Sequence, residues 1–260
     1  MPFKDIIVEK EEKVLIIKIN RPQVLNALRM DTFLELEQIL KDFAEADEYW
    51  AMMITGEGDR ALSAGGDIKA LNSMDSSDAV GFASLTHRIL DLMENIPKPI
   101  IAVVNGLALG AGCDLTIACD LVIASEKAQF GQPSASLGIT TPFGGTQRLP
   151  RIVGPKRAKQ LFFTGRAIDA EEALRFGLVN IVVKHENLWL EARKLVERIF
   201  RHAPIAIGFY KRLVNFSSYG DIGEGDVLES ELFVKCFETE DKGEGTSAFI
   251  EKRRPVFRGR

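Results

Sequence analysis

Short apolar runs alternate with amphipathic stretches along the first two thirds of the chain. Runs rich in Ile, Val and Ala predict buried strands, and they occur at 14–19, 51–54, 100–104, 121–124 and 179–183. Two amphipathic stretches predict helices, one behind Asp31, a candidate N-cap, and one over 78–94 that ends before Pro97. This alternation predicts an α/β fold in which helices cover a sheet.

The last third of the chain has a helical pattern from Asn187 nearly to the end, with breaks near Pro204 and between Gly220 and Gly225. The pattern includes several aromatic side chains that a small appendage would not leave in water: Phe200, Phe209, Phe216, Phe233 and Phe237. We therefore expect this region to pack on the core or on a neighbouring subunit. We place the boundary between the two parts near residue 200.

Composition and charge exclude several classes of protein. The chain has 260 residues, 46% of them hydrophobic, and a net charge of −4. That length is enough for one substantial core, and the charge lacks the basic footprint that nucleic-acid binding requires. The most apolar run, 100–113, is interrupted by Asn105 and is too short for a membrane span. We expect a cytoplasmic protein with no membrane or nucleic-acid partner.

No metal or redox site is expected from the cysteines and histidines. Cys113, Cys119 and Cys236 lack C-x-x-C spacing and are expected to be reduced thiols. The three histidines form no H-E-x-x-H motif, and no G-x-S-x-G elbow marks a serine hydrolase. His87 lies on the second predicted helix, where it either reaches a site or is an ordinary helical residue.

Two glycine-rich turns, SAGGDIK at 63–69 and GLALGAGCD at 106–114, each follow an apolar strand. Glycine allows a backbone to take positive φ and to approach a ligand closely. If each turn opens a helix, its free N–H groups can bind an anionic oxygen. Two such turns that converge would form an oxyanion hole. The alternative is a pair of ordinary tight turns; neither fits a phosphate-binding loop or a dinucleotide fingerprint.

A specific resemblance runs through almost the whole chain, from about residue 14 to residue 257. Seven strings, in order, resemble the enoyl-CoA hydratase/isomerase (crotonase) family: NRPQVLNAL, GGDIKAL, NGLALGAGCDL, CDLVIASEKAQFGQP, LGITTPFGGTQRLPRIVG, TGRAIDAEEALRFGLVN and FIEKRRPVF. The resemblance implies a core of repeated ββα turns over 1–200 and a C-terminal helical trimerisation region over 201–260. It also implies trimers that commonly pair into hexamers, a CoA thioester substrate and no cofactor.

The same resemblance assigns roles to individual residues. The backbone N–H groups of Gly66 and Ala111 would bind the thioester carbonyl. The segment Asp67, Ile68 and Lys69 would line the substrate site, with Lys69 near the CoA phosphates. In the family, positions matching Phe233 and Lys252 close over the adenine end, often from a neighbouring subunit. The alternative for these two is an ordinary core Phe and a surface Lys.

The acid–base positions depart from the family pattern. Hydratases of this family have one Glu directly after the G-x-G-C segment and another directly after the FGQP string. Here these positions are Asp114 and Ser134. Asp keeps a carboxylate but shortens it by one methylene, and Ser offers only a hydroxyl that can orient water. The two-Glu mechanism is therefore absent, and one carboxylate beside an oxyanion hole remains.

Three functions fit this set of residues. The first is a hydro-lyase that acts on an enoyl- or dienoyl-CoA, which we favour. The second is an isomerase that moves a double bond with Asp114 alone. The third is a non-catalytic acyl-CoA-binding protein; Ser134 favours it slightly, but a binder has no need of Asp114.

Overall fold

The computed structural model describes residues 3–260, which fold around a six-stranded sheet. The strand order is β1-β2-β3-β5-β7-β10, and every pair is parallel except β1 with β2. The strands are β1 (Ile6–Glu11), β2 (Val14–Ile19), β3 (Ala51–Gly56), β5 (Ile100–Val104), β7 (Leu121–Ser125) and β10 (Ile181–Val183). The five strands predicted from apolar runs are confirmed.

A second, four-stranded sheet has the order β4-β6-β8-β9. Its strands are three residues long: β4 (Ala61–Ser63), β6 (Leu107–Leu109), β8 (Gln129–Gly131) and β9 (Ala167–Asp169). Each pass of the chain gives one strand to each sheet, β3 then β4, β5 then β6, β7 then β8, and helices follow each pair. The expected ββα repetition is therefore confirmed.

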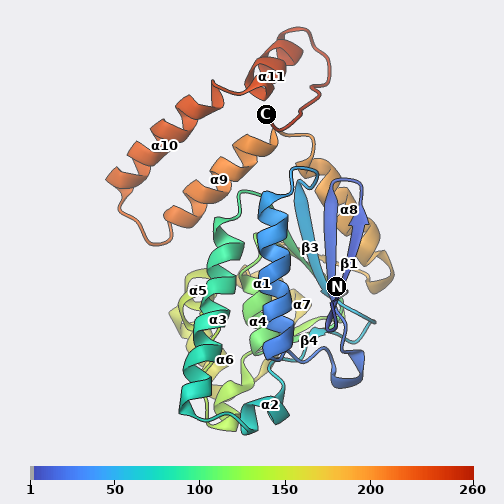
Figure 1. The fold of residues 1–260 in the computed structure, drawn as a ribbon, viewed down its shortest axis with the longest axis vertical. Helices are drawn as coiled ribbons and strands as arrows, with labels where there is room; N and C mark the ends of the chain where they lie inside the picture. The colour runs from blue at the N-terminus through green and yellow to red at the C-terminus, as the bar shows by residue number, and fades with distance from the viewer. Residues whose placement is uncertain (1–2) are drawn as a thin grey trace.

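Helices cover both faces of the larger sheet because alternate residues of each buried strand point to opposite faces. On one face, Leu15, Ile17 and Met52 pack under α1 and α3, which lie side by side (Figure 1). On the other face, Ile16 and Met53 pack against α8. The helices of the core are α1 (Met30–Glu45), α2 (Ile68–Asn72), α3 (Ser76–Asn95), α4 (Ala111–Ile117), α5 (Gly145–Val153), α6 (Pro155–Thr164), α7 (Ala170–Phe176) and α8 (Leu188–Ile199).

The C-terminal helices extend away from the two sheets, at the opposite end of the molecule from α2 (Figure 1). They are α9 (Pro204–Phe216), α10 (Ile222–Cys236) and α11 (Glu240–Ile250). A buried lysine attaches α9 to the core: Lys211 Nζ lies 2.8 Å from Asp120 Oδ2 and donates to the carbonyl oxygens of Met93 at 2.7 Å and Lys98 at 3.2 Å.

Two local predictions are corrected by the structure, and one strand was not predicted. Helix α1 begins at Met30 with Arg29 as its N-cap, so Asp31 lies inside the first turn. Strand β1 was not predicted, because it is an edge strand whose charged residues face solvent. Gly223 and Gly225 lie within α10 rather than in a break. No helix of residues 3–260 is long and apolar enough to cross a membrane.

Candidate active site

The two glycine-rich turns lie against each other because parallel strands β4 and β6 deliver them to the same edge of the smaller sheet. Gly65 has φ 113° and Gly110 has φ 51°, conformations that favour glycine. A Cβ atom on Gly65 would lie 3.0 Å from Leu109 O and 3.7 Å from Ala111 N. The expected convergence of the two turns is therefore confirmed, and it depends on glycine at these positions.

Two backbone N–H groups remain free where the turns meet. Ala111 is the first residue of α4, so its N–H has no acceptor within the helix. On the other turn, Leu28 N donates to Gly65 O at 2.8 Å and Asp67 N donates to Leu28 O at 2.7 Å, which holds Gly66 from both sides. Over residues 3–260, neither Gly66 N nor Ala111 N donates to a protein acceptor. Both N–H groups are therefore left without an acceptor within the described residues.

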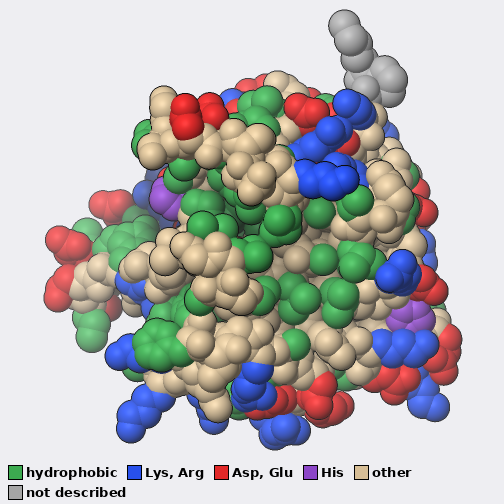
Figure 2. Space-filling model, turned by 90° about the horizontal axis from the view of Figure 1, so that it is seen from below, with side chains coloured by type: hydrophobic (Ala, Val, Ile, Leu, Met, Phe, Trp, Pro, Cys, Tyr) green, Lys and Arg blue, Asp and Glu red, His purple; other side chains and the backbone are tan. Residues whose placement is uncertain are grey.

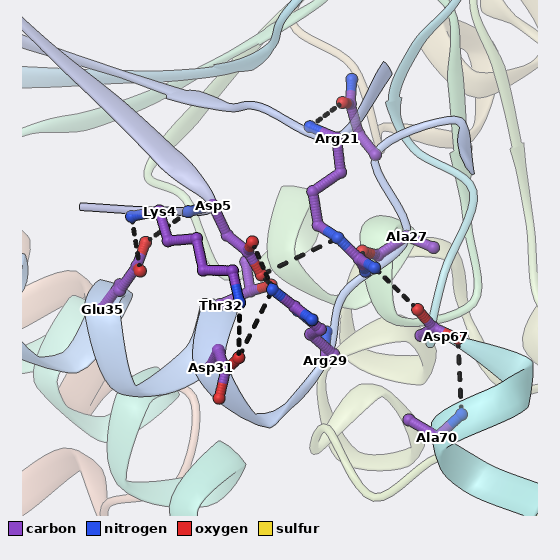
Figure 3. Close-up of polar contacts among 11 residues, drawn as sticks. Lys4, Asp5, Arg21, Ala27, Arg29, Asp31, Thr32, Glu35, Asp67 and Ala70 are labelled. Carbon is purple, nitrogen blue, oxygen red and sulfur yellow. Dashed lines mark hydrogen bonds and ion pairs between the residues drawn. The ribbon is translucent and has the colours of Figure 1, made fainter. Parts of the chain in front are cut away.

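Asp67 supports its turn from a network that reaches the N-terminal strand (Figure 3). Its Oδ1 accepts from the N–H groups of Lys69 and Ala70, which caps α2, and its Oδ2 accepts from Arg21 at 2.9 Å. Partial burial opposes ionisation, but the bonds from Arg21 and the helix N–H groups keep the pKa of Asp67 below its usual value. The Asp67 side chain thus fixes the turn, and its oxygens are already occupied.

Asp114 is fully buried in the first turn of α4. Burial raises the pKa of Asp114 to about 7, although hydrogen bonds from Thr141 and Gln132 and the positive charge of Arg148 act to lower it. A carboxyl group with a pKa near 7 is suited to take up and release a proton at neutral pH. Of the acid–base residues expected from the sequence, Asp114 is the one with this property.

Three residues that the sequence reasoning did not select surround the Asp114 carboxylate. Gln132 Nε2 donates to Oδ1, and the Thr141 hydroxyl donates to Oδ2. A Cβ atom on Gly145 would overlap Oδ1, so only glycine leaves room for the carboxylate at this position. The Oε1 atom of Gln132 is buried without a hydrogen-bond partner in residues 3–260. Gln132 lies in the FGQP string that carried the resemblance, and that string was the available signal.

Ser134 lies beside the second glycine-rich turn, at Gly110. It belongs to the 3-10 helix η2 (Pro133–Leu137), and its Oγ would be 3.9 Å from a Cβ atom placed on Gly110. Its hydroxyl is half-buried and, in the described part of the chain, bonds neither to Asp114 nor to another protein group. Ser134 thus lies close to the turn at Gly110, directly before Ala111.

The remaining predicted residues fall into two groups. Ile68 and Lys69 are exposed at the start of α2, directly after Gly66 and Asp67. Phe233, on α10, and Lys252, which follows α11, lie on the C-terminal helices at the other end of the molecule (Figure 1). One chain therefore does not bring the two groups together. His87 is an exposed residue of α3, in agreement with an ordinary helical role.

No group of His, Cys, Asp and Glu side chains over residues 3–260 is arranged to hold a metal ion. Cys113, adjacent to Asp114, is fully buried, and burial raises the pKa of its thiol. A thiol of raised pKa stays protonated and is a poor nucleophile.

The sequence of the chain also matches those of known proteins. The sequence pattern of the Enoyl-CoA hydratase/isomerase family matches residues 9–260. The chain belongs to this family. It is 44% identical to a crotonyl-CoA hydratase of Syntrophomonas wolfei, over 99% of both chains, and 43% identical to a short-chain-enoyl-CoA hydratase of Clostridium acetobutylicum, over 98% of this chain and 97% of the relative.

The fold of the family is equally clear among solved structures. The crystal structure of an enoyl-CoA hydratase from Bacillus anthracis superposes with a TM-score of 0.95 at 36% identity and covers 99% of this chain and 100% of the other. The predicted family, its fold class and the expectation of a lyase-type enzyme are confirmed by these relatives. The roles of individual residues stay predictions.

Proposed function

We propose that this protein is a hydro-lyase that adds water to, or removes it from, an enoyl- or dienoyl-CoA thioester. The observation that carries the proposal is the pairing of two free N–H groups, from Gly66 and Ala111, with a carboxyl group whose pKa is about 7. The N–H pair is suited to a carbonyl oxygen that becomes negative, and a group with that pKa is suited to move a proton. Together they match the chemistry of an α,β-unsaturated thioester.

The reaction in the hydration direction needs one base and one place for negative charge. Water attacks the β carbon, its proton passes to Asp114, and the electrons of the double bond move to the thioester oxygen as an enolate. Gly66 and Ala111 donate to that oxygen, and each such donor contributes about 3 kcal/mol to lowering the barrier. The proton on Asp114 then returns to the α carbon, so one carboxyl group serves both steps. Ser134 orients the water with its hydroxyl.

The surface next to the site suits the rest of an acyl-CoA. Ile68, directly after the first glycine-rich turn, is 52% exposed, and Leu137 and Ile139, which follow Ser134, are also exposed. Exposed apolar side chains therefore follow the first glycine-rich turn and the Ser134 segment. Seen from the end of the molecule that carries α2, hydrophobic side chains gather on the surface with charged ones around them (Figure 2). Over residues 3–260, Lys69 forms no ion pair with a carboxylate, so its ammonium is free for a phosphate.

Two other functions use the same site. An isomerase would take a proton from one carbon with Asp114 and return it to another, with no use for Ser134 or water. A non-catalytic binder would keep the N–H pair. The pKa of Asp114 favours an enzyme, since a binder gains nothing from a buried carboxyl group that titrates near neutral pH.

We further propose that Phe233 and Lys252 act on the site of a neighbouring copy, in a homo-trimer or a dimer of trimers. Helices α9 and α10 expose large apolar side chains that line a groove of about 720 Å³: Tyr210, Val214, Phe233 and Val234. Such an exposed apolar area is typical of an interface. Light scattering that found a monomer at micromolar concentration would contradict this assembly.

Binding of CoA tests the substrate class without any assumption about the chemistry. We expect CoA and acetyl-CoA to raise the melting temperature, because a ligand that binds only the folded state stabilises it. Lys69→Ala should reduce this shift, more strongly at low salt, since salt screens an exposed phosphate contact. Lys194→Ala is the matched control, an exposed lysine on α8. No shift with millimolar CoA species would exclude both the enzyme and the binder.

A further inference from the structure

Thr141 lies on the segment between η2 and α5, and its hydroxyl donates to Oδ2 of Asp114. We propose that Thr141 is the positioning residue that keeps Asp114 ionised and oriented for proton transfer. The inference rests on the proposed acid–base role of Asp114. In this site Ser134 occupies the position where the family has a second carboxylate. A neutral hydroxyl, that of Thr141, therefore supports the carboxylate of Asp114.

The neighbours of Thr141 fix the direction of this hydrogen bond. The Thr141 oxygen accepts from the backbone N–H of Phe143 at 3.3 Å, so the hydroxyl proton is left to point at Asp114. Gln132 serves the other carboxylate oxygen. Each carboxylate oxygen of Asp114 thus accepts one hydrogen bond and keeps a lone pair for the transferred proton. Two donors favour the ionised form, which is the form that a base requires.

The segment that carries Thr141 is fixed on its C-terminal side. Phe143 is buried against Phe33 and Phe82, with ring centroids 4.7 Å and 6.0 Å away. The hydroxyl of Thr86 on α3 lies 2.9 Å from the carbonyl oxygen of Pro142. These contacts hold the backbone next to Thr141 independently of Asp114. Loss of the Thr141 hydroxyl alone should therefore leave the segment in place.

Burial distinguishes Thr141 from the other neighbours of the carboxylate. Gln132 and Gly145 are buried, whereas Thr141 is half-buried. Of these three, Thr141 is the one that reaches toward the surface, where a substrate arrives. A change at Thr141 therefore alters the electrostatics of Asp114 without opening the core around Gln132.

The pH dependence of hydration tests the proposal. Thr141→Val keeps the shape but cannot donate, so Asp114 ionises less readily and the rise of kcat/KM with pH should move from near 7 to higher pH, by about one unit. At pH 7, kcat should fall more than KM changes. Thr141→Ser should restore the wild-type profile. Thr140→Val, an exposed neighbour on the same segment, is the matched control and should leave the profile unchanged.

A titration of Asp114 itself gives a second readout that needs no substrate. In protein labelled with carboxyl-13C aspartate, infrared difference spectra follow ionisation, and Asp114→Asn identifies the band. We expect its midpoint to rise in Thr141→Val and to return in Thr141→Ser. A Val variant with the wild-type midpoint would overturn the proposal. A shifted midpoint in a protein that turns over no enoyl-CoA would support the role of Thr141 and count against the proposed function.

Discussion

Asp114→Asn is expected to lower turnover of the best enoyl-CoA substrate by roughly 10²- to 10⁴-fold, the range attributed to a general acid–base group. Asn matches the shape of Asp and still forms hydrogen bonds with Gln132 and Thr141, but it cannot take up and return a proton. In the proposed mechanism both proton transfers pass through Asp114, so no second carboxylate is available to compensate. The loss should appear in kcat and in kcat/KM alike.

CoA binding provides the control for this variant. The groups proposed to bind the thioester and the CoA phosphates lie on Gly66, Ala111 and Lys69, so the thermal shift of Asp114→Asn with CoA should match that of the wild type. The measurement is steady-state turnover of both proteins on the same thioester, beside the thermal shift. An Asp114→Asn variant that retained full turnover would remove Asp114 from the mechanism.

The same substitution is expected to change how stability depends on pH. The unfolded chain releases the Asp114 proton near its ordinary pKa of 3.8, whereas the folded protein holds it up to about 7. Between these values the folded state binds more protons, so Asp114 makes the free energy of unfolding fall as pH rises, until pH passes the folded pKa. The total cost above pH 7 is about 4 kcal/mol.

Denaturant unfolding at fixed protein concentration measures this effect. Asn carries no such proton, so the stability of Asp114→Asn relative to the wild type should improve by about 2 to 3 kcal/mol between pH 5 and pH 8. Asp67→Asn is the control: its lowered pKa lies below this window, so its relative stability should stay constant across it. If the stability of Asp114→Asn relative to the wild type also stayed constant between pH 5 and pH 8, Asp114 would already be ionised at pH 5.

The central strands β2, β3, β5 and β7 of the larger sheet were predictable from sequence because they are buried on both faces and therefore form nearly unbroken apolar runs. The smaller sheet was not. Strands such as Ala61–Ser63 and Gln129–Gly131 are three residues long, and their pairing is set by the larger strands that precede them. The predicted start of α1 also differs from the observed one. The helix begins at Met30, before Asp31, because the backbone N–H of Arg29 donates to the Thr32 hydroxyl and caps the helix there.

The site was predictable only in part. The glycine turns and Asp114 stood out through their pattern and the family resemblance. Thr141 did not, because its role depends on the return of the chain after η2, which brings its hydroxyl to a residue 27 positions earlier. The raised pKa of Asp114 could not be predicted from the sequence either, because it arises from burial, which depends on the tertiary fold.

The product formed from a panel of enoyl- and dienoyl-CoA thioesters tests the central claim most directly. Mass spectrometry distinguishes the candidate reactions, because hydration adds one water to the substrate while double-bond migration leaves its mass unchanged. We expect a product one water heavier, with its oxygen labelled when the reaction runs in 18O-water, and no such product from Asp114→Asn. A product of unchanged mass, or unaltered thioesters across the panel, would contradict it.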